Sequence, residues 1–154
     1  MKHLFAITSV CIAFNAYAGS DQVFEKSFNQ KMDAAYSSVS KSLEANGFKI
    51  VYEVDIGNNL KNLAEKLGPA YNQSKLESTK SIVFCHGIFA NKIGNADPAM
   101  MALCPLHVTL IQKDSVTTVL FVKPGAVAKG SPAEAAAKEL EIKVIKTIES
   151  SDAK

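Results

Sequence analysis

The chain has 154 residues, of which 47% are hydrophobic and 21% are charged, a composition typical of one ordinary globular domain. This composition excludes collagen-like, coiled-coil and fully disordered chains. All 17 basic residues are lysines, and 15 acidic residues reduce the net charge to +2. Nucleic-acid-binding proteins carry clustered positive charge and use arginine to grip phosphate in a bidentate way, so we expect no nucleic-acid partner.

Residues 1–18 have the pattern of a secretory signal peptide. A basic start precedes an apolar run over residues 4–14, and the small residues Ala16 and Ala18 then predict cleavage after Ala18. The apolar run is shorter than the roughly 20 residues that a membrane-spanning helix needs, and no later segment approaches that length. We therefore expect a periplasmic protein with no membrane span after signal cleavage, and one domain over residues 19–154.

The first predicted elements of the mature chain are a short strand and an amphipathic helix. The strand is expected at residues 22–26. We expect Ser27 or Asn29 to cap the start of the helix and Asn46-Gly47 to end it. Apolar side chains recur every three or four residues between these signals, which is the period of one helix face. They are Met32, Ala35, Tyr36, Val39 and Leu43.

The next segments predict a strand, a short helix and a polar loop. Residues 48–54 alternate as in a strand, which puts Phe48 and Tyr52 among the core candidates together with Ile50 and Val54. Residues 59–67 predict a short helix that ends at Gly68-Pro69, and residues 70–79 a loop. The apolar side of this helix is formed by Leu60, Leu63, Ala64 and Leu67.

The second half of the chain predicts three more strands and a long helix. Residues 81–85 form a short apolar strand pattern, and Asp97-Pro98 opens a helical turn. Residues 105–112 and 116–122 are rich in β-formers and are joined by a three-residue polar turn. The motif Ser131-Pro132-Ala133-Glu134 is a capping box for the last helix. The apolar side of that helix is formed by Ala133, Ala137, Leu140, Val144 and Ile148.

This order of elements predicts an α+β fold. We expect an antiparallel β-sheet of about four to five strands, with two long helices packed on one face, as a two-layer sandwich. No internal repeat or low-complexity linker interrupts the mature chain.

Three blocks of the sequence resemble the DUF302 family, a bacterial family of unknown function. They are Leu43-Glu-Ala-Asn-Gly-Phe-Lys-Ile50, Ile82-Val-Phe-Cys-His-Gly87 and Asp97-Pro-Ala-Met-Met-Ala-Leu-Cys-Pro-Leu-His-Val108. The chain departs from the family pattern at His86-Gly87, where the family has Asn-Pro, and at Cys104-Pro105, where the order of cysteine and proline is exchanged. The resemblance implies a compact α+β domain, often a homodimer, with no established catalytic activity.

Cys85 and Cys104 are the two cysteines that remain after signal cleavage. In an exported protein two cysteines most simply form a disulfide bond. One ends a predicted strand and the other precedes the next, and the 18 residues between them are enough to fold back. We therefore predict a structural Cys85–Cys104 disulfide that braces the sheet.

A copper, zinc or haem site is the alternative. Its candidate ligands are Cys85, His86, Cys104, His107 and Met100, since thiolate, imidazole and thioether are ligands for soft metals. The spacing argues against one shared site, because adjacent strand residues such as Cys85 and His86 point to opposite faces.

The sequence shows no nucleophile, base and orienting acid in a recognisable arrangement. We therefore predict a non-catalytic binding domain, with no cofactor and with a ligand that the sequence does not identify.

Overall fold

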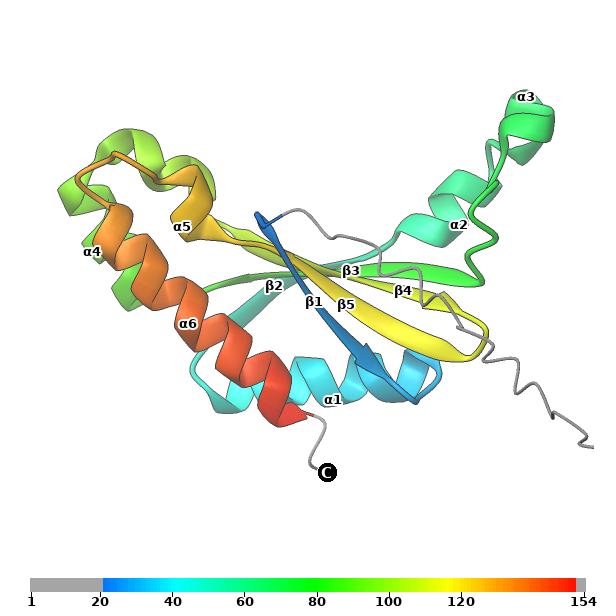
Figure 1. The fold of residues 1–154 in the computed structure, drawn as a ribbon, viewed down its shortest axis with the longest axis horizontal. Coiled ribbons are helices and arrows are strands. Elements are labelled where there is room, and N and C mark those ends of the chain that lie inside the picture. Colours follow the sequence, from blue (N-terminus) through cyan, green and yellow to red (C-terminus); the bar gives the residue numbers. More distant parts are fainter. Residues whose placement is uncertain (1–20, 152–154) are drawn as a thin grey trace, which may run out of the picture.

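The computed structural model describes residues 21–151, and the predicted signal peptide lies outside these residues. Five antiparallel strands form one sheet in the order β1-β5-β4-β3-β2, so β1 and β2 are its edges (Figure 1). The strands are β1 (Val23–Phe28), β2 (Lys49–Asp55), β3 (Ser78–Cys85), β4 (Leu106–Lys113) and β5 (Val116–Val122).

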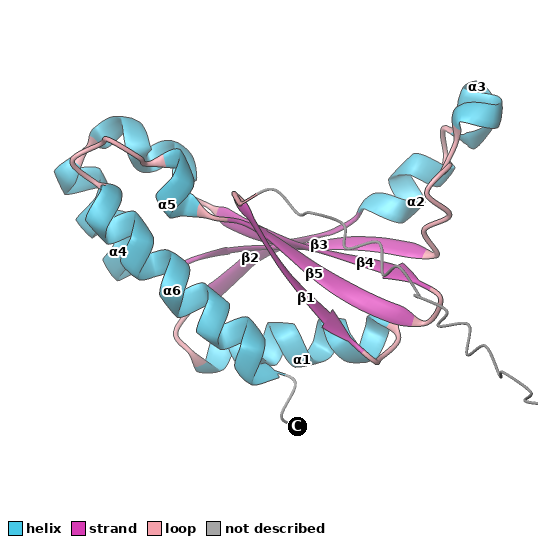
Figure 2. Cartoon of the chain, in the orientation of Figure 1, coloured by secondary structure: helices cyan, strands magenta, loops and turns pink. Residues whose placement is uncertain are grey.

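Two long helices, α1 (Met32–Ala45) and α6 (Glu134–Ser150), pack on the same face of this sheet (Figure 2). The predicted α+β two-layer fold is therefore confirmed. Shorter elements lie beyond the strand ends, and no helix among residues 21–151 is long and apolar enough to cross a membrane. These shorter elements are α2 (Ile56–Lys61), α3 (Ala64–Leu67), the 3₁₀ helix η1 (Gly68–Ala70), α4 (Gly87–Ala96), the 3₁₀ helix η2 (Pro98–Leu103) and α5 (Pro124–Val127).

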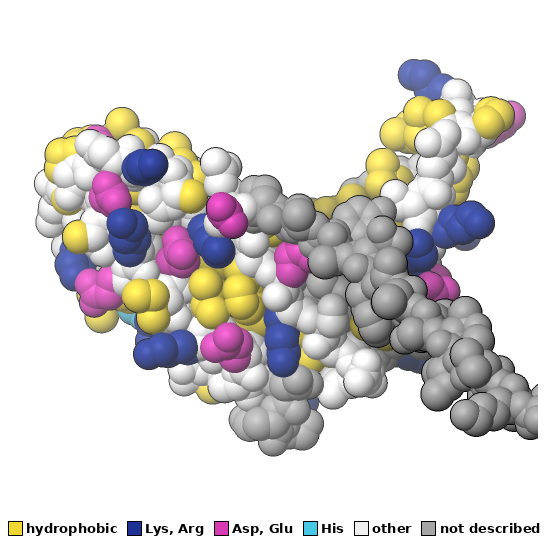
Figure 3. Space-filling model, in the orientation of Figure 1, with side chains coloured by type: hydrophobic (Ala, Val, Ile, Leu, Met, Phe, Trp, Pro, Cys, Tyr) yellow, Lys and Arg dark blue, Asp and Glu magenta, His cyan; other side chains and the backbone are white. Residues whose placement is uncertain are grey.

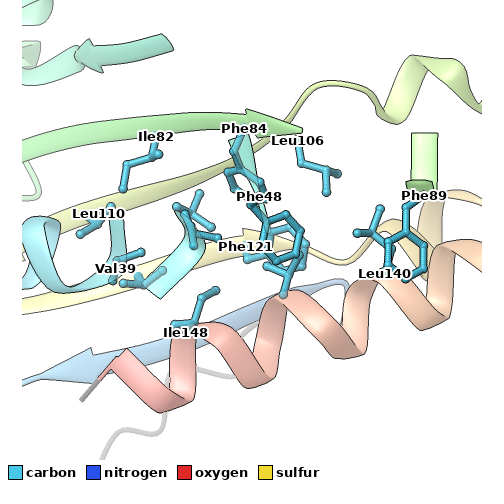
Figure 4. Close-up of a cluster of buried hydrophobic side chains, with 14 of the residues drawn as sticks. Val39, Phe48, Ile82, Phe84, Phe89, Leu106, Leu110, Phe121, Leu140 and Ile148 are labelled. Atoms are coloured by element: carbon cyan, nitrogen blue, oxygen red, sulfur yellow. The ribbon is translucent and has the colours of Figure 1, made fainter. Parts of the chain in front are cut away.

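The core lies between the sheet and the two long helices. In α1, Met32, Ala35, Val39 and Leu43 are buried, so the predicted apolar stripe is confirmed except at Tyr36, which is half-buried. Every predicted apolar position of α6 is also buried. From the sheet, aromatic rings fill the centre, with Phe48 and Phe84 packed edge to face at 5.3 Å between ring centroids (Figure 4).

The start of α1 differs from the prediction. Neither Ser27 nor Asn29 caps it, because the helix begins after Lys31, whose side chain makes no capping hydrogen bond. Instead the backbone N–H of Met32 donates to Oε1 of Gln112 on β4, at 2.6 Å. The cap thus comes from a residue that is far away in the sequence.

The prediction for Tyr52 is wrong. Phe48 is buried as expected, but Tyr52 is 66% exposed. The pairing of β2 with β3 shifts between Ile50 and Tyr52, so Val51 is an extra residue in the strand, as in a β-bulge. One extra residue exchanges the two faces for every position after it, so Tyr52 and Val54, both predicted in the core, point away from the helices.

The helix predicted at residues 59–67 is instead divided into α2 and α3. With η1, these two helices form an arm that projects from the ends of β2 and β3 (Figure 1), and none of their residues is buried. Leu60, Leu63 and Leu67 therefore stay 46%, 45% and 41% exposed and do not enter the core. The sequence also gave no signal for α4, whose buried residues are Phe89 and Ile93.

Candidate functional site

The two cysteines lie side by side at one end of the sheet. Cys85 is the last residue of β3, and Cys104 follows η2 and is separated from β4 by Pro105. Both are free thiols and both are half-buried. Burial raises the pKa of the Cys104 thiol most, and the neighbouring Cys85 side chain raises it further. The structure thus places the two cysteine side chains next to each other as free thiols, and the disulfide bond between them stays a prediction.

The raised pKa of Cys104 affects what this pair can do. A thiolate is the form that attacks a substrate or binds a metal, and a thiol with a raised pKa is largely protonated near neutral pH. Such a thiol is a weak nucleophile. The raised pKa therefore argues against Cys104 as the nucleophile of a catalytic site.

His86 lies on the other side of the strand end. Its ring packs edge to face against Phe48 and Phe89, at 5.2 and 5.1 Å between ring centroids. The Nδ1 atom is buried without a hydrogen-bond partner, and burial, together with the positive charge of Lys143, lowers the pKa of this histidine. The structure therefore places His86 in an apolar environment that favours its neutral form.

His107 is exposed on β4 and is paired with Val83 of β3. Because paired residues share a face and Cys85 is two residues after Val83, His107 and Cys85 lie on the same face of the sheet. Met100 packs partly against the core. Among residues 21–151 no three His, Cys, Asp or Glu side chains come together to hold a metal ion, and the metal alternative stays a prediction.

The face of the sheet that points away from α1 and α6 is a surface that no sequence motif indicates. In β4 and β5 burial alternates: Val108, Leu110 and Val119 are fully buried, whereas their neighbours are half-buried or exposed. The strand register places these neighbours on one face, which we call the open face. Its apolar members are Val23, Tyr52, Val54, Val83, Ile111, Leu120 and Val122.

The open face has little charge at its centre. One row runs across all five strands through Glu25, Leu120, Thr109, Ser81 and Val54. Glu25, on the edge strand β1, is the one ionised group in that row. The centre therefore consists of aliphatic and small hydroxyl side chains, and such a scarcity of charged groups is typical of the middle of an interface.

The fold and the three sequence blocks at residues 43–50, 82–87 and 97–108 agree with one known family. The sequence model of the family described as "Domain of unknown function DUF302" matches residues 24–151. The chain belongs to the DUF302 family. The resemblance noted in the sequence is thereby confirmed, and it extends over the sheet and both long helices of this DUF302 domain.

A solved structure supports the same assignment. The crystal structure of an uncharacterized conserved protein DUF302 from Bacillus stearothermophilus is similar to this chain, with a TM-score of 0.72 and 15% sequence identity. The similarity covers 84% of this chain and 98% of the other. At that identity the likeness shows the fold. The search of curated proteins finds no match.

Proposed function

We propose that this DUF302 domain is an exported, non-catalytic binding domain that acts through the open face of its sheet. The observation that carries the proposal is the alternation of burial along β4 and β5, which leaves one apolar face of the sheet without a covering helix among residues 21–151. A solvated face is ordinary for an antiparallel sheet, but a contiguous apolar patch on such a face is typical of a site of interaction.

We propose a second copy of the chain as the occupant of this face. Five strands about 4.8 Å apart and about six residues long give a face of roughly 24 by 20 Å, or about 480 Å². Two such faces packed together would bury about 1,000 Å², which is the lower limit for a specific interface. A flat sheet face also fits another sheet face well, since two sheets stack at about 10 Å. The homodimer that the family resemblance implies agrees with this occupant.

The signal-peptide pattern of residues 1–18 supports export to the periplasm. In that compartment the adjacent Cys85 and Cys104 are expected to form a disulfide bond that braces the end of the sheet. The lack of a catalytic role is supported by the raised pKa of Cys104 and by His86, which lies on the other side of the strand end from Cys85. A turnover activity that is lost on substitution of Cys85 or His107 would contradict the non-catalytic assignment.

The experiment is the Leu120→Lys variant, examined by sedimentation equilibrium. Leu120 lies in the central row of the open face and is paired with Glu25, so the new lysine has a carboxylate across the strand and the monomer should still fold. We expect the parent protein to sediment as a dimer and the variant as a monomer, because the new ammonium group and the Glu25 carboxylate would both lose their water in the interface, which costs more free energy than their mutual attraction returns.

The matched control is Ile88→Lys, which introduces the same charge at a 75% exposed position of α4, outside the open face. This control should remain dimeric. A parent protein that is monomeric, or a Leu120→Lys variant that is as dimeric as the control, would show that the open face does not bind a second copy.

A further inference from the structure

The arm between β2 and β3 leaves apolar side chains in solvent. Leu60, Leu63 and Leu67 are each more than 40% exposed, and Figure 3 shows hydrophobic side chains along the projecting arm. Exposed leucines in one short segment are unfavourable unless something covers them, because each buried leucine side chain contributes about 1.5–3 kcal/mol. A ligand that covered these leucines would therefore gain free energy of binding.

A pocket of about 430 Å³ lies between this arm and the start of β3. Its size is in the range of 300–1,000 Å³ that is typical of small-molecule sites. Two of the exposed leucines, Leu60 and Leu67, line it, whereas Leu63 does not. Its remaining apolar lining comes from Ala70, Tyr71 and Leu76.

The walls of this pocket are held in place by specific contacts. A Cβ atom at Gly57 would lie 3.1 Å from the backbone nitrogen of Thr79, so glycine at this position lets α2 approach β3 closely. Asp55 caps α2 by accepting a hydrogen bond from the backbone N–H of Asn58, at 2.8 Å. The turn before β3 is closed by two hydrogen bonds between Asn72 and Leu76, at 2.8 and 2.9 Å.

The polar groups of the lining indicate the charge of the ligand. Glu77 is already bound on both oxygens, by the side chain of Gln112 and by the backbone N–H of Asp114. Of the other ionised groups in the lining, Asp55 stands at the start of α2 and Lys61 at its end. The Cα atoms of these two oppositely charged residues are about 9 Å apart along the helix axis. Because the two partners of Glu77 are neutral groups, its charge remains, and the lining carries two carboxylates and one ammonium, which repel an anionic ligand and leave an uncharged one unaffected.

We propose that this pocket binds an uncharged amphipathic small molecule. Its apolar body packs on Leu60, Leu67 and Leu76, and its polar group lies against the amide, hydroxyl and carboxylate groups at the rim. The site is formed by one chain, at the arm and the start of β3. Its test is therefore separate from the question of whether the open face binds a second copy.

The experiment is a fluorescence titration of the full mature chain with the uncharged dye N-phenylnaphthylamine. We expect saturable binding of one dye per chain. The Leu60→Asp variant should bind at least about tenfold more weakly, since loss of one buried leucine contact is worth about that factor. The sulfonated analogue of the dye, anilinonaphthalene sulfonate, has the same aromatic body and should bind more weakly to the parent protein than the uncharged dye.

Leu63→Asp is the matched control, because Leu63 is as exposed as Leu60 and belongs to the same arm but does not line the pocket. It should bind the dye as the parent protein does. If Leu60→Asp proves unfolded by circular dichroism, Leu67→Asn on α3 replaces it. Absence of saturable binding, equal losses in Leu60→Asp and Leu63→Asp, or equal affinity for the sulfonated dye would each overturn the proposal.

Discussion

His86 is a titratable group that the fold keeps in an apolar environment. Its ring lies between Phe48 and Phe89, and its Nδ1 atom is buried without a partner. Burial, and then the positive charge of Lys143, lowers its pKa in the folded protein below the ordinary value of 6.5. The unfolded chain therefore binds a proton at this residue more readily than the folded protein does.

This difference predicts a pH-dependent stability. Above pH 6.5 both states hold the neutral ring, and His86 gives no pH dependence. As the pH falls below that value the unfolded state is protonated first, so the free energy of unfolding decreases until the folded-state pKa is passed. Urea unfolding at about pH 7 and about pH 5 measures the decrease. His86→Phe, which keeps the ring contacts, should reduce it.

His107→Asn is the control for this measurement, because it removes a histidine from an exposed position of β4. We expect this variant to keep the pH dependence of the parent protein. If His86→Phe loses stability with falling pH as steeply as the parent protein, the dependence arises from other groups and the argument from burial is wrong.

Single residues could be predicted from the sequence where the strand alternation is regular. The separation of Cys85 from His86 follows from that alternation, and the structure places the two side chains on opposite sides. The exposure of Tyr52 could not be predicted in the same way. The extra residue Val51 exchanges the two faces of the strand, and nothing in the sequence marks it as a bulge. The surroundings of His86 also depend on α4, which the sequence did not reveal.

Gln112 joins three elements of the fold. Its carbonyl oxygen accepts from the first N–H of α1, and its amide group donates to Glu77, just before β3. Glu77 in turn accepts from the backbone N–H of Asp114 in the turn between β4 and β5. One half-buried side chain on β4 therefore replaces the local cap that the sequence led us to expect.

The Gln112→Ala variant should lower the free energy of unfolding by about 1–2 kcal/mol, the usual cost of losing a helix cap and one further hydrogen bond. The midpoint of urea unfolding should shift while the slope stays the same. Gln73→Ala is the control, because Gln73 makes one exposed hydrogen bond within the arm, at 3.3 Å. A Gln112→Ala variant as stable as this control would show that the cap contributes nothing measurable.

At the scale of elements, amphipathic patterns predicted α1 and α6 well because both helices bury their apolar stripe. The same kind of pattern in residues 59–67 misled, because periodicity reports that one side is apolar and not what covers that side. In the structure the arm projects from the strand ends, and two of its three exposed leucines, Leu60 and Leu67, line a pocket instead of the core. The cap of α1 could not be predicted for a related reason, since Gln112 is distant in sequence.

For the whole molecule, the sequence predicted the α+β class and the two layers but neither the strand order nor the open face. Strand order depends on which long-range pairings form, and alternation along one strand carries no information about its neighbours. The open face became visible only when the register aligned Leu120, Thr109, Ser81 and Val54 in one row. A binding surface of this kind is a property of the assembled sheet and not of a motif.

The last prediction concerns the stability of the whole exported protein. A Cys85–Cys104 bond would close a loop of about 20 residues that contains α4 and η2, worth roughly 3 kcal/mol in the chain-entropy model. Cys85→Ser should therefore lower the melting temperature by several degrees, on the order of 10 °C, and so should a reductant on the parent protein. Mass spectrometry should find the parent protein lighter by two hydrogen atoms.

The control is Ser40→Ala, which changes a small half-buried side chain that is not a cysteine. In this variant the reductant should lower the melting temperature as much as in the parent protein. Free thiols with stoichiometric copper or zinc would instead favour a metal carrier, and a melting temperature insensitive to the reductant would contradict the disulfide.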